Sequence, residues 1–218
     1  MDFNNLDLET GDILLFQHVK NKSTPFQMFD NFLSWAISSW THSPYTHIGM
    51  VIKESKLGHK TLDPNKTYIW ESGYEGTPDP QDGKIRLGVQ ITDLESMMKN
   101  FTGKLYVRKL DCPDDECRRI FNTQILSKIQ AQVYGKPYDL NIVDWLTAFS
   151  RTDFRPQKVD RFWCSAFVGY IYTQAKILRD NTDWSIIRPS DFSVEDKDEH
   201  LEFNTNVVLE KKQYLLCE

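Results

Sequence analysis

The chain has 218 residues, of which 40% are hydrophobic, 13% aromatic and 26% charged, and its formal net charge is −5 at pH 7. This composition is that of a folded globular protein and excludes a disordered or fibrous chain. The acidic balance argues against a protein that binds nucleic acid by neutralising its phosphates. A chain of this length buries about 70% of its unfolded surface, so we expect a single domain over residues 1–218.

The first elements expected along the chain are a strand and an aromatic helix. Residues 11–17 form a short apolar run behind a Gly-Asp pair, which is typical of a buried strand. Residues 26–40 follow a helix-starting pair, with Thr24 as N-cap and Pro25 at the first helical position. Large apolar residues recur there on one stripe: Phe26, Phe29, Leu33, Ile37 and Trp40. Such a stripe usually faces the core, although it could instead face lipid or an acyl substrate.

After Pro44, several segments separated by polar or Gly/Pro-rich connections have the pattern of strands. These segments are residues 46–53, 67–71, 84–90 and 103–110. Their close spacing predicts an antiparallel sheet. Between the last two segments, Thr92 and Glu95 stand three positions apart and predict a capping box for a short helix that ends before Phe101.

The second half of the chain has a more helical pattern. A helix is expected over residues 114–134, ending at the Gly135-Lys136-Pro137 sequence. Its apolar residues recur at intervals of four: Phe121, Ile125, Ile129 and Val133. Two further helices are expected over residues 140–149 and 163–178, and residues 206–210 could add a last strand.

The four cysteines, Cys112, Cys117, Cys164 and Cys217, are too few and too unevenly spaced for a disulfide framework. We therefore expect free thiols. Cys112 and Cys117 could bind zinc only together with a second pair of ligands, which the neighbouring sequence lacks. Accordingly, we expect neither a metal nor a cofactor.

Targeting signals are not visible in the sequence. The first ten residues, M-D-F-N-N-L-D-L-E-T, lack the basic and apolar regions of a secretory signal. No run of 18 apolar residues indicates a membrane-spanning helix. The expected location is the cytoplasm, or the host cytoplasm if the protein is viral.

Three residues form a candidate catalytic set. Cys164 opens an apolar helical segment, and the unpaired backbone N–H groups and positive dipole of a helix N-terminus stabilise a thiolate. His47 begins a predicted strand, and Glu71 ends the next one. Adjacent antiparallel strands could bring the carboxylate to one ring nitrogen of His47 and leave the other for the thiol. The alternative interpretation is a buried cysteine that acts as a small hydrophobe, with Glu71 as a solvated carboxylate.

The order of six motifs resembles the circularly permuted NlpC-type papain-like hydrolases, and in particular the YiiX-like proteins of bacteria and their poxvirus relatives. Lecithin:retinol acyltransferases are more distant relatives of this group. The motifs span most of the chain and are G-D-I-L-L-F (11–16), T-H-I-G-M-V (46–51), I-W-E-S (69–72), Y-G-K-P-Y-D (134–139), F-W-C-S-A-F-V (162–168) and R-P-S-D-F (188–192).

The resemblance implies an α+β fold in which an antiparallel sheet or half-barrel packs against the helix that bears the nucleophile. It also implies that Cys164 is the nucleophile, His47 the general base and Glu71 the residue that orients the base. Tyr45, Ser165 and Tyr138 are implied as residues that contact the substrate or the oxyanion, and Asp139 and Asp191 as structural or groove-lining residues.

The expected activity is that of a papain-like cysteine hydrolase: an amidase, protease, or lipid acyl hydrolase or acyltransferase. The substrate would be a small peptide-like or lipid acyl compound, and the aromatic residues 26–40 favour an acyl substrate or a peripheral lipid contact. A second hypothesis is a non-catalytic papain-like module that binds a small amino-acid-like or lipid ligand. A third is a structural interaction protein in which Cys164 is merely buried. The sequence leaves the oligomeric state open.

Overall fold

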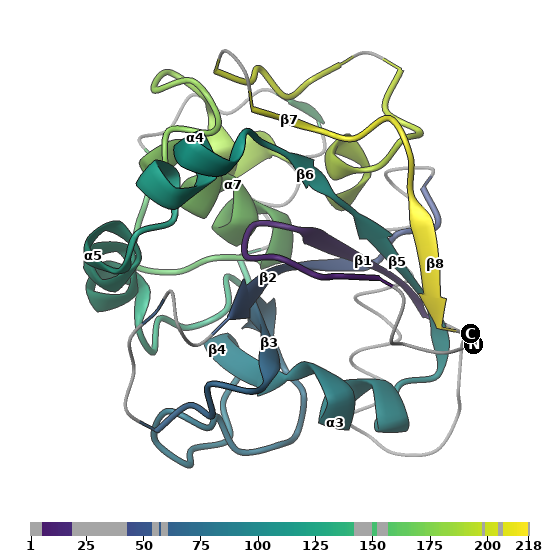
Figure 1. Ribbon diagram of the computed structural model, residues 1–218. Helices are drawn as coiled ribbons and strands as arrows, with labels where there is room; N and C mark the ends of the chain where they lie inside the picture. The colour runs from purple at the N-terminus through teal and green to yellow at the C-terminus, as the bar shows by residue number, and fades with distance from the viewer. Residues whose placement is uncertain are drawn as a thin grey trace.

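The computed structural model describes residues 6–18, 43–53, 57, 61–141, 150–151, 157–197, 199–204 and 207–217. Over these residues the protein has an α+β fold built on a six-stranded sheet with the order β4-β3-β2-β1-β5-β8 (Figure 1). All of its strand pairs are antiparallel. The strands are β1 Ile13–His18, β2 His47–Lys53, β3 Thr67–Gly73, β4 Gly88–Asp93, β5 Gly103–Arg108 and β8 Tyr214–Cys217.

A small second sheet and several helices complete the described fold. The second sheet pairs β6, Leu110–Asp111, with β7, Val208–Leu209. The α-helices are α3 Leu94–Asn100, α4 Asp114–Ile120, α5 Thr123–Val133 and α7 Cys164–Gln174. Two 3₁₀ turns follow α7, η2 over Trp184–Ile186 and η3 over Pro189–Phe192.

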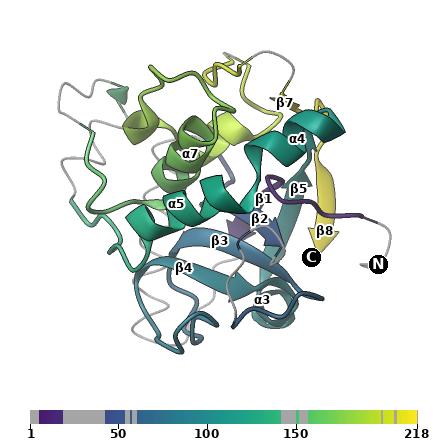
Figure 2. The ribbon, with the colours of Figure 1, turned by 60° about the vertical axis from the view of Figure 1, so that its left-hand side comes forward.

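The main sheet has an apolar core on each face because side chains alternate along its strands. Ile48, Met50 and Ile52 of β2 point to the face covered by α5 and α7, where they join the larger core. Val51 of β2 and Ile69 of β3 point to the opposite face, beside α3. Figure 2 shows α5 and α7 on one side of the strands and α3 on the other. Helix α7 therefore packs directly against β2 and β3, the strands that carry the candidate base and carboxylate.

The expected antiparallel sheet is confirmed, with shifted ends. The strand predicted over residues 84–90 begins at Gly88, and the segment 103–110 divides into β5 and β6. Strand β8 was not predicted, and the strand expected at 206–210 is the two-residue β7. The aromatic segment 26–40 and most of the helix expected at 140–149 lie outside the described residues.

The single helix expected over residues 114–134 is wrong, because the chain forms two helices that meet at Phe121 and Asn122. The Asn122 side chain accepts a hydrogen bond from the Ile125 N–H and so caps a new helix. Phe121 is fully buried and packs against Gly11, whose φ of +104° suits a residue without a side chain. The spacing of apolar residues favours one continuous helix. The burial of Phe121 and the cap at Asn122 outweigh it and divide the segment into two helices.

The expectation of four free thiols is also wrong. Cys112 and Cys117 form a disulfide, with their Cα atoms 5.8 Å apart. Cys117 lies in α4 and Cys112 lies just before that helix, so one helical turn brings the two thiols together. Cys164 and Cys217 are free.

No helix among the described residues is both long and apolar enough to cross a membrane.

Candidate active site

His47 and Glu71 are in contact across neighbouring strands. The β2–β3 register pairs Met50 with Trp70, and its continuation sets Glu71 diagonally across from His47. The His47 Nε2 and Glu71 Oε2 atoms are 2.7 Å apart. The Glu71 side chain is completely buried, whereas 12% of the His47 side chain is exposed. The sheet thus places a buried carboxylate behind an imidazole that still reaches the surface.

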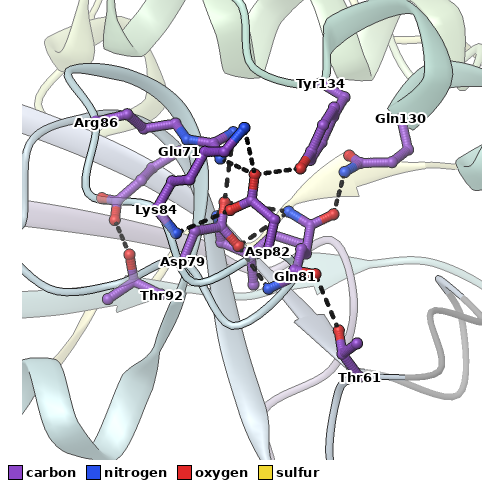
Figure 3. Close-up of polar contacts among 11 residues, drawn as sticks. Thr61, Glu71, Asp79, Gln81, Asp82, Lys84, Arg86, Thr92, Gln130 and Tyr134 are labelled. Carbon is purple, nitrogen blue, oxygen red and sulfur yellow. Dashed lines mark hydrogen bonds and ion pairs between the residues drawn. The ribbon is translucent and has the colours of Figure 1, made fainter.

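Thr92 holds the other oxygen of the same carboxylate. Its hydroxyl donates a 2.7 Å hydrogen bond to Glu71 Oε1 from the adjacent strand β4 (Figure 3). The capping box predicted from Thr92 and Glu95 is wrong, because Asp93 caps α3 by accepting from the Ser96 N–H. Because Thr92 was assigned to a helix cap, it was not predicted as a site residue. Its position on β4, next to the strand that carries Glu71, could have indicated this role.

Cys164 is the first residue of α7 and lies in the larger core, with 2% of its surface exposed. The N-cap residue, Trp163, provides no side-chain hydrogen bond to the helix. The N-terminal N–H groups and the positive end of the helix dipole are thus set around the thiol, where they favour negative charge. The thiol lies close enough to the His47 ring to be one of the causes that raise the pKa of the imidazole. Because His47 Nε2 faces Glu71, Nδ1 is the nitrogen left for the thiol.

The electrostatics of the site favour a protonated histidine. Burial by itself would lower the pKa of the His47 imidazole, because it disfavours the charged ring. The hydrogen bonds with Cys164 and Glu71, and the negative charge of those two groups, outweigh burial and hold the pKa well above its ordinary value of 6.5. These partners therefore favour the protonated form of the ring, which lies between a carboxylate and a sulfur.

Two glycines of these strands make room for the site. A Cβ atom on Gly73 would lie 2.9 Å from Cε1 of His47, so the ring packs directly on the glycine backbone. A Cβ atom on Gly49 would lie 2.6 Å from the Ile69 side chain and 3.2 Å from the Cβ of Glu71. Any larger residue at position 73 or 49 would displace the base or the carboxylate that supports it.

The loop before Cys164 is fastened to the strand that carries Glu71. The buried Ser72 hydroxyl donates a 2.7 Å hydrogen bond to the carbonyl oxygen of Phe162. Phe162 also donates its N–H to Pro137 and accepts from the Asp139 N–H. These bonds set the nucleophile-bearing segment against both β3 and residues 137–139. Sequence analysis had not assigned a role to Ser72.

A cavity of about 550 Å³ opens beside this loop. Its lining is Pro137, Tyr138, Leu140, Asn141, Asp160 and Arg161. Tyr138 forms a parallel bridge with Phe162, two residues before Cys164, so one lining residue pairs with the segment that leads into α7. The lining combines apolar side chains with an acid, a base and an amide, a composition suited to a small amphipathic ligand.

The remaining predicted site residues have different surroundings. Tyr138 lines the cavity. The Ser165 hydroxyl is buried and donates to the Ile187 carbonyl at 2.7 Å, which ties the first turn of α7 to the segment after η2. The Tyr45 hydroxyl accepts from Gln213 at 2.7 Å and lies 3.5 Å from Glu195. Ser165 and Tyr45 thus use their hydroxyls in contacts within the fold.

Asp139 and Asp191 both accept hydrogen bonds within the fold. Asp139 is buried and accepts from the Asn141 N–H at 2.9 Å. Asp191 is buried, and its carboxylate accepts hydrogen bonds of 2.6 and 3.1 Å from the two terminal nitrogens of Arg151.

Two groups of described side chains have the donor atoms and spacing to hold a metal ion. One consists of His47, Glu71 and Glu75, and the other of Asp191, Asp196 and His200. In each group the ligand atoms lie within 4.8 Å of one another. The first group contains the catalytic candidates themselves.

The chain was compared with protein families, curated proteins and solved structures. No family model matches the chain, and no curated protein matches it. Among solved structures, the chain is similar to the crystal structure of the metalloprotein YiiX from Escherichia coli O157:H7, with 19% sequence identity and a TM-score of 0.47. The comparison covers 96% of this chain and 99% of YiiX. YiiX belongs to the group that the motif order resembles, but no activity follows from a likeness at this level.

Proposed function

We propose that the protein is a cysteine hydrolase or acyltransferase that acts on an amide or ester bond. The observation that carries the proposal is the chain of contacts from the Cys164 thiol through the His47 ring to Glu71. A nucleophile, a base close to it and a buried carboxylate that orients the base are the parts needed for acyl transfer through a covalent intermediate.

The first half of the reaction forms an acyl-thioester. The Cys164 thiol passes its proton to His47 Nδ1, and the thiolate sulfur attacks the substrate carbonyl carbon. The carbonyl oxygen gains negative charge, which the backbone N–H of Cys164 at the N-terminus of α7 is placed to stabilise. His47 then donates its proton to the leaving amine or alcohol as the bond to the carbonyl carbon breaks.

The second half releases the acyl group. His47, now neutral, removes a proton from water or from an acceptor alcohol or amine, and the resulting nucleophile attacks the thioester carbonyl. The carbon–sulfur bond breaks, and the cysteine leaves as the thiolate, paired again with the imidazolium. Throughout the cycle Glu71 holds Nε2–H, so that Nδ1 always faces the sulfur.

The arrangement is compatible with a circularly permuted papain-like fold. The base-bearing strands β2 and β3 precede the nucleophile helix α7 along the chain, and the helix packs against these two strands. We propose this permuted topology because the strands that carry the histidine and the carboxylate come before the helix that carries the cysteine.

The cavity beside Tyr138 is the proposed binding site for part of the substrate. Leu140 and Pro137 offer apolar surface, while Asp160 and Arg161 offer charges of both signs. This lining suits a small peptide-like compound or the polar end of an acyl compound. The helix expected over residues 26–40 was predicted to favour an acyl substrate, and it lies outside the described residues.

Covalent labelling of the intact protein tests the proposal without a known substrate. We expect iodoacetamide to alkylate Cys164 at least tenfold faster than Cys217 at pH 7, because burial raises the pKa of the Cys217 thiol. An acyl-thioester probe should add its acyl group to Cys164 and then lose it by hydrolysis. His47→Ala should abolish both reactions, whereas Cys217→Ser, the matched control, should change neither.

Two outcomes count against catalysis. Equal alkylation rates at Cys164 and Cys217 would mean that the α7 thiol is not activated. Fast alkylation without any acyl transfer across a broad set of thioesters and activated esters would instead favour the binding-module hypothesis. Peptide mapping by mass spectrometry identifies the modified cysteine in each case.

A further inference from the structure

Three segments that are distant in the chain form one continuous surface beside the cavity. We call it the cavity-side surface, and its segments are residues 82–88, 134–141 and 158–162. The middle segment is joined to the first by a hydrogen bond from the Tyr138 N–H to the Leu87 carbonyl. It is joined to the third by a hydrogen bond from the Phe162 N–H to the Pro137 carbonyl. All the residues that line the cavity belong to the second and third segments.

Exposed apolar side chains gather on the cavity-side surface. Among the described residues, the three most exposed large apolar side chains are Ile85 at 54%, Leu140 at 48% and Val159 at 47%. Each of them lies on a different one of the three adjacent segments, and the exposed ring of Tyr134 adds to the group. Single exposed apolar side chains are ordinary, but a group of them beside a cavity is typical of an interaction surface.

The charge of this surface is opposite in sign to that of the whole chain. Its five basic and three acidic residues give a net charge of +2, whereas the chain has a net charge of −5. The basic residues are Lys84, Arg86, Lys136, Lys158 and Arg161, and the acidic ones are Asp82, Asp139 and Asp160. Within the described ranges, Lys136 and Lys158 have neither a side-chain hydrogen bond nor an ion pair. Their ammonium groups are therefore available to an anionic partner.

Side-chain contacts hold the first two segments together. The guanidinium carbon of Arg86 lies 5.2 Å from the centre of the Tyr134 ring. Arg86 also pairs with Asp82, which accepts a hydrogen bond from the Tyr134 hydroxyl (Figure 3). The exposed apolar and basic side chains are thus carried by a backbone that is fixed before any partner binds.

We propose that the cavity-side surface binds an anionic membrane. Apolar side chains beside basic ones suit the membrane interface, where the apolar groups enter the boundary between headgroups and acyl chains. The lysine ammonium groups then lie at the negatively charged headgroups. Because Leu140 belongs both to this surface and to the cavity lining, the cavity adjoins the lipid in the bound state. This surface is separate from the 26–40 segment, on which the sequence-based expectation of a lipid contact rested.

The apolar group distinguishes a membrane from a nucleic acid. A nucleic acid would also be attracted to the lysines, because phosphate contacts supply most of its non-specific affinity. Such contacts make no use of Ile85 and Val159, which carry only aliphatic side chains. A membrane uses both kinds of side chain, so it accounts for the whole surface.

The first measurement is co-sedimentation of the wild-type chain with lipid vesicles. Binding to phosphatidylcholine vesicles that contain about one-third phosphatidylserine should be at least tenfold tighter than binding to phosphatidylcholine alone. Raising the salt from about 0.1 M to about 0.5 M should weaken it at least threefold by screening. Cys164→Ala should bind equally well, so the result does not depend on the proposed catalysis. Absence of binding to the phosphatidylserine vesicles at low salt would overturn the proposal.

The second measurement tests the basic residues. Lys136→Gln/Lys158→Gln should weaken vesicle binding about twenty-five-fold, because each lysine near an anionic membrane contributes about fivefold. Lys211→Gln/Lys212→Gln removes the same charge from two exposed lysines outside the surface and should weaken binding less than threefold. Equal losses in the two double variants would mean that no particular face is used, and would reject this surface.

The third measurement tests the apolar residues. Ile85→Ser/Val159→Ser should weaken vesicle binding at least tenfold. The matched control is Val194→Ser/Val208→Ser, whose valines are 43% and 44% exposed outside the surface, and it should bind as the wild type does. Circular dichroism checks that each variant is folded. If binding is lost in the lysine variant but unchanged in Ile85→Ser/Val159→Ser, the surface recognises a polyanion such as a nucleic acid, and membrane binding is rejected.

Discussion

The hydroxyl of Ser72 donates a hydrogen bond of 2.7 Å to the carbonyl oxygen of Phe162. Ser72 follows Glu71 in β3, and Phe162 lies two residues before Cys164. One buried bond therefore connects β3, the strand that carries Glu71, to the segment that precedes Cys164. Because the two segments are 90 positions apart in the chain, this bond sets the distance between the parts of the site.

Replacing Ser72 by alanine should loosen this connection. The Phe162 carbonyl keeps the N–H of Asp139 as a donor, so we expect a loss of about 1 kcal/mol in the free energy of unfolding. The alkylation rate of Cys164 at pH 7 should fall about tenfold. Chemical denaturation and iodoacetamide labelling measure the two effects. A changed stability with an unchanged alkylation rate would limit Ser72 to a structural role.

Thr92 should support the orientation of Glu71. Thr92→Val keeps the shape of the side chain but leaves one oxygen of a buried carboxylate without its donor, which should destabilise the fold by about 1–3 kcal/mol. The Cys164 alkylation rate should fall as the Glu71–His47 contact weakens. Thr92→Ser restores a hydroxyl and should recover most of the rate. Failure of serine to recover any rate beyond that of valine would contradict the assigned hydrogen bond.

Substitutions of Glu71 should separate its charge from its geometry. Glu71→Gln can still accept a hydrogen bond from His47 but loses the charge that stabilises the imidazolium, and Glu71→Ala loses both. With any substrate or acyl probe, the rate should decrease in the order wild type, Gln, Ala. Because the side chain is fully buried, each rate must be normalised to the folded fraction from circular dichroism. If the alanine variant is as active as the wild type, Glu71 does not orient His47.

The raised pKa of His47 predicts how stability depends on pH. The folded protein holds the proton more tightly than the unfolded chain, whose histidine titrates near 6.5. The stability that this proton contributes is therefore fully present below pH 6.5 and is lost as the pH rises through the higher, folded-state value. In His47→Gln this loss should be absent.

The measurement is urea denaturation of the wild type and His47→Gln from pH 6 to 10, with EDTA present. The difference in unfolding free energy between the two proteins should shrink as the pH rises. NMR titration of His47 should give a pKa above 6.5 in the wild type and a lower one in Glu71→Gln, since the carboxylate is one cause of the shift. A His47 pKa at or below 6.5 would mean that burial outweighs the two partners.

The sequence by itself determined the local elements and the identity of the central candidates. Alternating apolar residues predicted β2 and β3, and the apolar run behind Cys164 predicted the helix α7. Both patterns depend on which face of a strand or helix is buried, which neighbouring residues alone can encode. His47, Glu71 and Cys164 were predicted as candidates because their residue types are chemically distinctive at strand and helix ends.

Only the tertiary structure decided how these elements meet. The roles of Thr92 and Ser72 depend on partners 21 and 90 positions away, and serine and threonine carry no local pattern that names a distant partner. The break between α4 and α5 depends on burial of Phe121 against Gly11, and the Cys112–Cys117 disulfide depends on the start of α4. Strand pairing and core packing determine such contacts, because each gains its free energy only when remote segments come together.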